Sequence, residues 1–201
     1  MPIRYLYMVM EEDELLKKYN TLYLEILMRY KDEIEKGETL YVAELPKLVT
    51  PQDESVLAVV NNIKSSFAAY SLDDNFYDAA MKAQAYINTS VSGISVPVQF
   101  WLTPSEVIRM GAGDVFDKTV LLCSILIGLG NLTARIVTVV KGSGSESAVY
   151  CEFHSKLLLL RADGRMGEFD GKQGLLAAMG FSDDPGTTAY EFNDKMYSSI
   201  A

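Results

Sequence analysis

The sequence predicts an α+β fold, with several helices first and an antiparallel sheet after them. Up to about residue 128, apolar residues recur at spacings of three and four, which is the pattern of helices with one buried face. After Gly130, short runs rich in β-branched residues take over, and turns that contain glycine separate them. Because helical and strand patterns do not alternate along the chain, parallel βαβ units are not expected.

The first predicted helix is amphipathic, about six turns long, and ends at Gly37. We expect residues 1–70 to form an N-terminal helical extension and residues 71–201 to form the main domain. The alternative is that both belong to one continuous globular unit, which a chain of 201 residues also allows. The apolar stripe of the first helix contains Leu15, Tyr19, Leu22, Ile26 and Tyr30.

A helix that begins after Asp114 is expected to form the centre of the fold. Asp114 is a favourable N-cap, and the predicted helix continues to Gly128. Residues 115–127 are apolar nearly all round, and a helix without a polar face belongs inside the protein, here packed on the sheet. Other helices are expected to begin near Thr50-Pro51, Ser71 and the capping box of Thr103 and Glu106.

The predicted sheet consists of short strands joined by recognisable turns. The sequence Asp163-Gly164 is a strong hairpin signal, and the Gly/Ser-rich residues 142–147 are expected to form a loop. The residues after Gly171 carry little pattern. Strands are expected at residues 134–141, 149–154 and 157–162, with a further short strand near Phe169.

Composition excludes several classes of function. The net charge of −9 and the pI near 4.7 disfavour binding to nucleic acid, because such a surface repels phosphate. The longest apolar run, residues 120–129, is too short to cross a bilayer, and no signal peptide is evident. The two cysteines show no disulfide or metal-binding spacing. We therefore expect a cytoplasmic protein that binds neither membranes nor nucleic acid.

The start of the helix after Asp114 is where a nucleophile would be activated. Unpaired amides and the positive end of the helix dipole would lower the pKa of a cysteine there and stabilise an oxyanion. A histidine on a following strand would act as base, and a carboxylate on the next strand would orient it. The only histidine, His154, lies at the end of a predicted strand, and Asp170 follows the next hairpin.

Three separated segments of the chain form a recognisable set. The chain has W-L-T-P-S-E at residues 101–106, G-D-V-F-D at residues 113–117, and Arg135 near the start of a predicted strand. Together they resemble transglutaminase-like cysteine proteinases of the papain-like superfamily, which have a W-x-T-P-x-E segment, a G-D-C-x-D helix start and a strand that begins near an arginine. The resemblance covers about residues 93–172. It implies the family's fold, and it maps the catalytic histidine and aspartate onto His154 and Asp170.

The chain departs from this family at the catalytic cysteine, because Val115 occupies that position. Valine has no nucleophile, so the resemblance identifies a degenerate member in which no catalytic residue is expected. Cys123 is about 12 Å further along the same helix and is expected in the core. Cys151 is three residues before His154, and in a regular strand the two side chains point to opposite faces.

Three functions are compatible with these residues. The leading hypothesis is a non-catalytic domain that acts as a binding or scaffolding module for a protein or peptide partner, without a cofactor. The first alternative is a Ca²⁺- or Mg²⁺-binding protein that uses carboxylates around the vacated site, together with His154. The second alternative is a protease or transglutaminase with a displaced nucleophile. The candidate metal ligands are Asp114, Asp117, Glu168 and Asp170.

Overall fold

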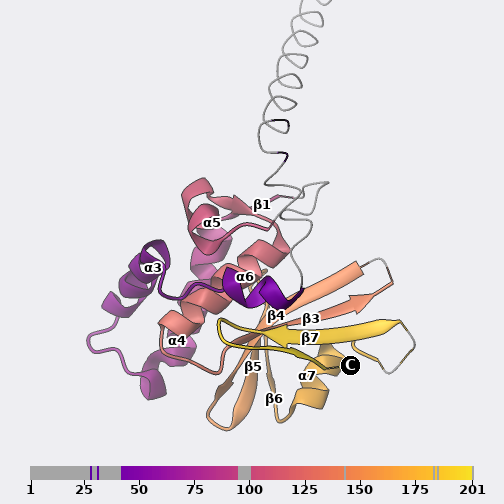
Figure 1. Cartoon of the computed structure of the whole chain (residues 1–201). Coiled ribbons are helices and arrows are strands. Elements are labelled where there is room, and N and C mark those ends of the chain that lie inside the picture. The colour runs from indigo at the N-terminus through magenta and orange to yellow at the C-terminus, as the bar shows by residue number, and fades with distance from the viewer. Residues whose placement is uncertain are drawn as a thin grey trace, which may run out of the picture. The chain divides into compact units, whose positions relative to one another are not determined.

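The computed structural model describes residues 42–94, 101–142, 144–182, 184 and 186–200, together with Met28 and Lys31 (Figure 1). The first predicted helix therefore lies outside the described residues. The chain separates into two compact units, residues 1–40 and residues 41–201. The second unit contains everything that follows, so residues 42–70 pack into the same core as the residues after them.

The second unit has its helices first and its sheet second, so the α+β class is the one the sequence predicted. Among the described residues, no helix has the length and apolar character needed to cross a membrane. A two-stranded parallel pair, β1 (Ser92–Gly93) and β2 (Ala112–Gly113), joins two of the helical segments. The helices are η1 (Val42–Leu48), α3 (Glu54–Ser65), α4 (Leu72–Ser90), α5 (Pro104–Met110), α6 (Val115–Gly128) and α7 (Lys172–Ala178).

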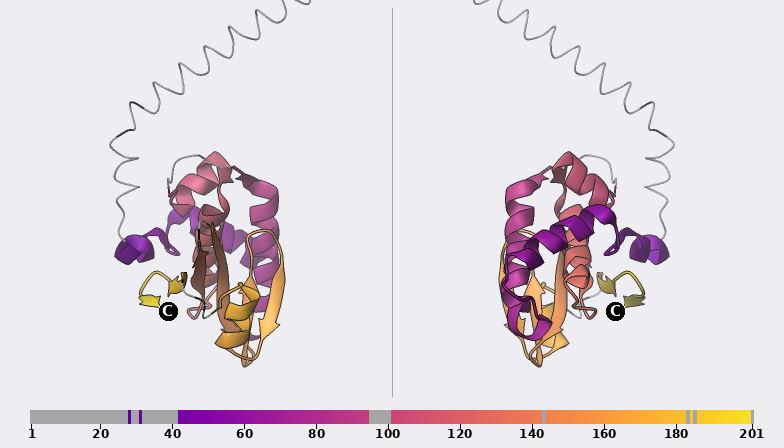
Figure 2. Two further views of the ribbon diagram at one scale, coloured as in Figure 1. Left: turned by 90° about the vertical axis from the view of Figure 1, so that its right-hand side faces the viewer. Right: turned by 90° about the vertical axis from the view of Figure 1, so that its left-hand side faces the viewer.

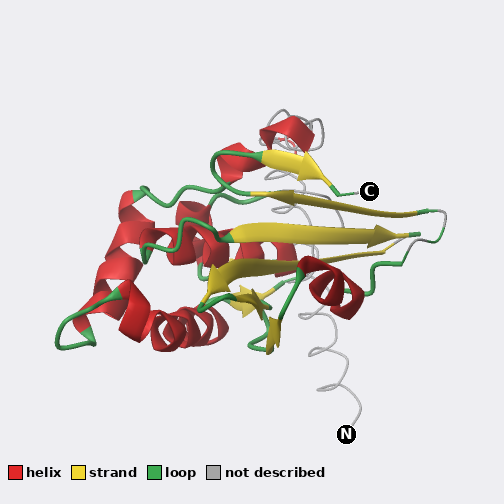
Figure 3. Cartoon of the chain, turned by 90° about the horizontal axis from the view of Figure 1, so that it is seen from below, coloured by secondary structure: helices red, strands yellow, loops and turns green. Residues whose placement is uncertain are grey.

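The main sheet has six strands in the order β6-β5-β4-β3-β7-β8, and all neighbours are antiparallel (Figure 3). The strand β7 comes from the tail, where the sequence carried little pattern, and it pairs with β3 inside the sheet. The strands are β3 (Arg135–Lys141), β4 (Gly144–Phe153), β5 (Lys156–Leu160), β6 (Met166–Phe169), β7 (Thr187–Phe192) and β8 (Tyr197–Ser199).

Two hydrophobic clusters lie on opposite faces of this sheet, whose ribbon Figure 2 shows from two further sides. The larger cluster joins η1, α3, α4 and α6 to side chains such as Val149, Cys151 and Leu160. The smaller cluster packs α7 against alternate residues of the same strands, such as Val137 and Tyr150. This alternation follows from the two-residue period of a strand. The helix α6 therefore lies between the sheet and the other helices.

The strand β4 begins earlier than the sequence predicted. Residues 144–147, expected in a loop, pair with β3, and the register joins Lys141 to Gly144 and Thr138 to Ser147. The hydroxyls of Thr138 and Ser147 share a hydrogen bond of 2.9 Å, which supports this extension with a buried cross-strand contact. As a result, β4 is ten residues long, and its two ends reach different parts of the molecule.

Candidate functional site

Two aspartates build the first turn of α6. Asp114 Oδ1 accepts a hydrogen bond of 2.8 Å from the Asp117 amide, and Asp117 Oδ2 accepts one of 3.0 Å from the Asp114 amide. This is a capping box with aspartate in place of glutamate. The other Asp117 oxygen, Oδ1, accepts a hydrogen bond of 2.9 Å from the Leu102 amide. The start of α6 is thereby joined to the segment that leads into α5.

Asp117 is 2% exposed, although it carries a carboxyl group. Burial is the largest influence on this group and raises its pKa to about 6, while the backbone hydrogen bonds from Leu102 and Asp114 lower it. The nearby Asp114 carboxylate raises it further. Asp117 is therefore an internal structural group with an unusually high carboxyl pKa.

Val115, the first residue of α6, is 65% exposed. Its side chain lines a cleft of about 390 Å³ between the helical layer and the sheet. Because the rest of α6 is almost entirely buried, this valine is an exception to the pattern of its own helix. The cleft is lined by Asn88, Val115, Lys118, Glu146, Ser147, Arg161, Ala162, Asp163 and Arg165.

The strand register decides which residues face Val115. Val149 pairs with Leu160, and continuing this antiparallel ladder by two residues places Ser147 across from Ala162. Both line the cleft together with Val115. A base on β4 and a carboxylate on the next strand would therefore stand at Ser147 and Ala162, and neither side chain can perform those roles.

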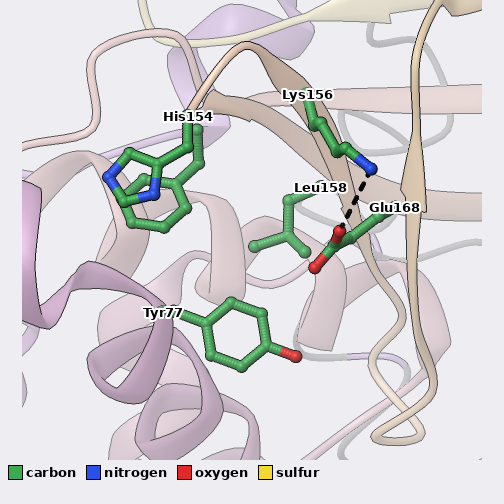
Figure 4. Close-up of a pocket in the computed structure, with 6 residues that line it drawn as sticks. Tyr77, His154, Lys156, Leu158 and Glu168 are labelled. Atoms are coloured by element: carbon green, nitrogen blue, oxygen red, sulfur yellow. Dashed lines mark ion pairs between the residues drawn. The ribbon is translucent and has the colours of Figure 1, made fainter.

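His154 lies at the opposite end of β4, so its predicted position beside Val115 is corrected. It occupies the turn between β4 and β5 with φ of 47°, and its ring stacks on Phe153 with the centroids 3.9 Å apart. Seven residues separate it from Ser147, which corresponds to roughly 23 Å along an extended strand. It lines a second pocket, of about 310 Å³, with Tyr77 and Glu168 among its other walls (Figure 4).

Asp170 and Glu168 also lie at this second end of the sheet. They belong to the end of β6, where Lys156 Nζ is 3.8 Å from Glu168 and 3.9 Å from Asp170 (Figure 4 shows the first of these pairs). The Asp170 side chain is 96% exposed. The structure therefore brings Glu168 close to His154 and leaves Asp170 in solvent nearby, away from Val115.

The four predicted metal ligands are divided between these two places. Asp114 and Asp117 cap α6, while Glu168 and Asp170 pair with Lys156. Within the described part of the chain, no three His, Cys, Asp or Glu side chains come together in a way that would hold a metal ion. Asp114 and Asp117 each accept a hydrogen bond from the other's backbone amide, so both carboxylates already serve the helix cap.

Both cysteines lie in the core rather than in the cleft. Cys123 and Cys151 are unpaired and fully buried, in the cluster between α6 and the sheet. Burial raises the pKa of the Cys151 thiol to about 12, and burial also raises the pKa of the Cys123 thiol. A thiol held in its neutral form is a poor nucleophile. Neither cysteine lines the cleft beside Val115.

Comparison with solved structures identifies a related fold. No protein-family model and no curated protein matches this sequence. The fold resembles that of LapG. Three structures of Legionella pneumophila LapG match it with TM-scores of 0.50, 0.51 and 0.52 and 16%, 16% and 17% sequence identity. They cover 80%, 84% and 80% of this chain and 88%, 87% and 86% of LapG, respectively.

The LapG likeness supports the transglutaminase-like fold that the sequence segments indicated. At this level of identity it concerns the fold and leaves the activity open. The second and third of these structures are named as calcium-bound and EGTA-treated, which is a property of LapG.

Sequence reasoning missed Lys118, Ser147 and Arg161, which line the cleft. The missing signal was the position of the β4–β5 turn. Placing the turn at His154-Ser155, with Phe153 paired to Lys156, brings residues 147 and 162 opposite each other by simple counting. The composition of residues 142–147 concealed this, because glycine and serine favour a loop over a strand.

Proposed function

We propose that this chain is a non-catalytic transglutaminase-like domain that acts as a binding module, with a peptide or a protein segment as the partner of its cleft. The observation that carries the proposal is the exposed Val115 at the first turn of α6. A hydrocarbon occupies the place of a nucleophile, while the surrounding cleft of about 390 Å³ is open and has a polar lining.

The base and the carboxylate of a catalytic triad are missing from this cleft as well as the nucleophile. Ser147 and Ala162 occupy the places from which a base and its orienting carboxylate would act, and His154 lies in the other pocket. Removing one member of a triad already eliminates most of its rate enhancement. Three simultaneous departures support a domain without that chemistry. The two free thiols fit the reducing, cytoplasmic setting that this proposal assumes.

The features of the cleft that remain are suited to recognition. Val115 offers apolar contact, while the exposed Asn88 offers hydrogen-bonding groups for the backbone of an extended segment. Charged side chains surround them. A pocket that combines apolar area with a few polar groups is the usual form of a ligand site.

A thiol-reactive probe and a set of fluorogenic peptide substrates test the loss of chemistry. We expect the native protein to react with iodoacetamide only after unfolding, and to hydrolyse no peptide above the buffer rate. The control is the Val115→Cys variant, whose exposed thiol is expected to react in the native state. Rapid, pH-sensitive labelling of native Cys151 would instead support an enzyme with a displaced nucleophile.

Cation binding is the competing function, since Asp114 and Asp117 lie beside Val115. In addition, one of the LapG structures is named as calcium-bound and another as EGTA-treated. Calorimetry with Ca²⁺ and with Mg²⁺ distinguishes the two proposals. We expect neither heat nor a change in melting temperature at about millimolar metal, because a ligand that binds only the native state must stabilise it. A melting temperature that rises with Ca²⁺ and is unresponsive in Asp114→Ala would favour the cation-binding function.

A further inference from the structure

The charged side chains of the cleft are not balanced. Three cations, Lys118, Arg161 and Arg165, share the lining with two carboxylates, Glu146 and Asp163. The lining is therefore positive by one charge, on a chain whose net charge is −9. An acidic ligand would be repelled by the net charge of the chain and attracted by the lining of this cleft.

The two arginines already have partners. Arg161 pairs with Glu146 through Nη1 and donates a hydrogen bond of 2.9 Å from Nη2 to the Ala178 carbonyl. Arg165 pairs with Asp163 at 2.7 Å. Lys118 makes no ion pair with any residue that the structure describes. The unbalanced positive charge of the lining is therefore that of Lys118.

Lys118 is also placed to contact a ligand that covers Val115. The two residues are three apart in α6, so their side chains are neighbours on one helix face. The Lys118 ammonium lies beside Gly93, where a Cβ atom would be 3.6 Å from Nζ, an ordinary van der Waals distance. A ligand side chain lying on Val115 would bring its end group to Lys118.

We propose that the cleft recognises an extended peptide segment through an acidic side chain, with the methylenes of an Asp or Glu on Val115 and its carboxylate on Lys118. This rests on the proposed binding function and names its ligand class. A monoanionic carboxylate matches one unpaired cation, whereas the dianion of a phosphate would also meet Glu146 and Asp163. The exposed Asn88 amide supplies hydrogen-bonding groups for the backbone of the segment.

An NMR titration of the full chain tests this recognition. The probe is a pentapeptide blocked at both ends, Ala-Ala-Glu-Ala-Ala, and the control is the same peptide with Gln at its centre. We expect the Glu peptide to shift the amides of Val115, Lys118 and Ser147 with a Kd about tenfold lower than that of the Gln peptide, because a charge-assisted contact is stronger than a neutral one. Higher ionic strength should weaken this preference.

Two lysine variants localise the effect. Lys118→Gln should remove the preference for the Glu peptide, and Lys118→Arg should retain most of it. Lys195→Gln is the matched control, because Lys195 is exposed and does not line the cleft. Unchanged discrimination between the Glu and Gln peptides in Lys118→Gln would overturn the proposal.

The remaining outcomes separate this proposal from the binding function on which it rests. If both peptides shift the cleft amides equally, the acidic preference is wrong and peptide binding stands. If neither peptide shifts these amides at about 5 mM, above the Kd expected for a weak specific contact, peptide binding fails as well. If inorganic phosphate shifts them at lower concentration than the Glu peptide, the ligand is a phosphate and the proposal is overturned.

Discussion

The two ends of strand β4 differ in what they offer a partner. At one end, Ser147 faces the start of α6, and the cleft there has an exposed valine and a lysine that pairs with none of the described acidic residues. At the other end, His154 lies in an exposed turn beside Tyr77 and the Lys156–Glu168 ion pair. The first end has a valine at a helix start and no histidine among the residues that line its cleft. The second end has a histidine and a nearby carboxylate, but Val115 does not line its pocket.

The difference shows that residue order along a chain does not establish a catalytic constellation. His154 and Asp170 follow Val115 in the order expected of a triad, but the turn at His154-Ser155 places the histidine one strand length away. Among the residues of β4, those that line the cleft with Val115 are Glu146 and Ser147, near its start. The predictions below test each end of β4 separately.

The largest expected effect is on stability at the start of α6. Asp117→Ala leaves the amides of Leu102 and Asp114 without their acceptor, and each buried unsatisfied donor is costly. We expect the free energy of unfolding to fall by about 2–4 kcal/mol, measured by urea denaturation. Asp170→Ala, at the exposed end of β6, should leave the urea midpoint unchanged. Equal effects from the two variants would contradict the difference between the two ends.

The second prediction concerns the pH dependence of stability. The pKa of Asp117 is raised in the folded protein from an ordinary value near 4 to about 6. The stabilisation of the folded state that comes from this raised pKa is therefore fully present below about pH 4. It is lost as the pH rises through 6, and in total it is on the order of 2–3 kcal/mol. Urea denaturation between pH 4 and 7.5 should show this decline in the wild type.

The Asp117→Asn variant provides the reference for that measurement. This variant cannot ionise at position 117. As the pH rises from 4 to 7.5, the wild type should therefore lose stability relative to the variant. Asp170→Asn, with its exposed side chain, should follow the wild type throughout. A difference between the wild type and Asp117→Asn that is independent of pH would show that the Asp117 pKa is not raised.

The third prediction tests which end of β4 faces residue 115. In Val115→Cys the new thiol should alkylate at the rate of an ordinary exposed thiol near a helix start, although His154 is present. Adding Ser147→His should lower the thiol pKa and raise the labelling rate at pH 6.5 by about tenfold, because a neighbouring imidazolium stabilises the thiolate. The rate of iodoacetamide alkylation as a function of pH is the measurement. No acceleration in the double variant would contradict the deduced register.

The smallest effect is expected at the turn itself. His154 and Ser155 have φ of 47° and 63°, in the left-handed region that asparagine and glycine tolerate better. His154→Asn together with Ser155→Gly should stabilise the protein by about 0.5–1 kcal/mol in urea denaturation. The cleft amides should keep their NMR positions. Displacement of the Val115 or Lys118 amide would show that the two ends of β4 are coupled.

Local sequence signals predicted α6 and the capping of α5 and α6 well. The helix expected to begin near Thr50-Pro51 instead begins at Glu54, with Asp53 as its N-cap. Asp114 is the N-cap of α6, α6 ends at Gly128 as expected, and the capping box of Thr103 and Glu106 is present. These features depend on residues three or four apart, which the sequence displays directly. The partners of β7 and the extension of β4 back to Gly144 depend on strands distant in sequence, and they were not predicted.

The sequence by itself determined that the chain is an α+β protein with a buried central helix that begins at a valine. These conclusions follow from periodicity, capping and residue identity. Only the tertiary structure decided that Ser147 and Ala162, rather than His154 and Asp170, lie beside that valine. The physical reason is that an antiparallel ladder brings together residues whose separation depends on where the turn lies, and this turn has an unusual sequence.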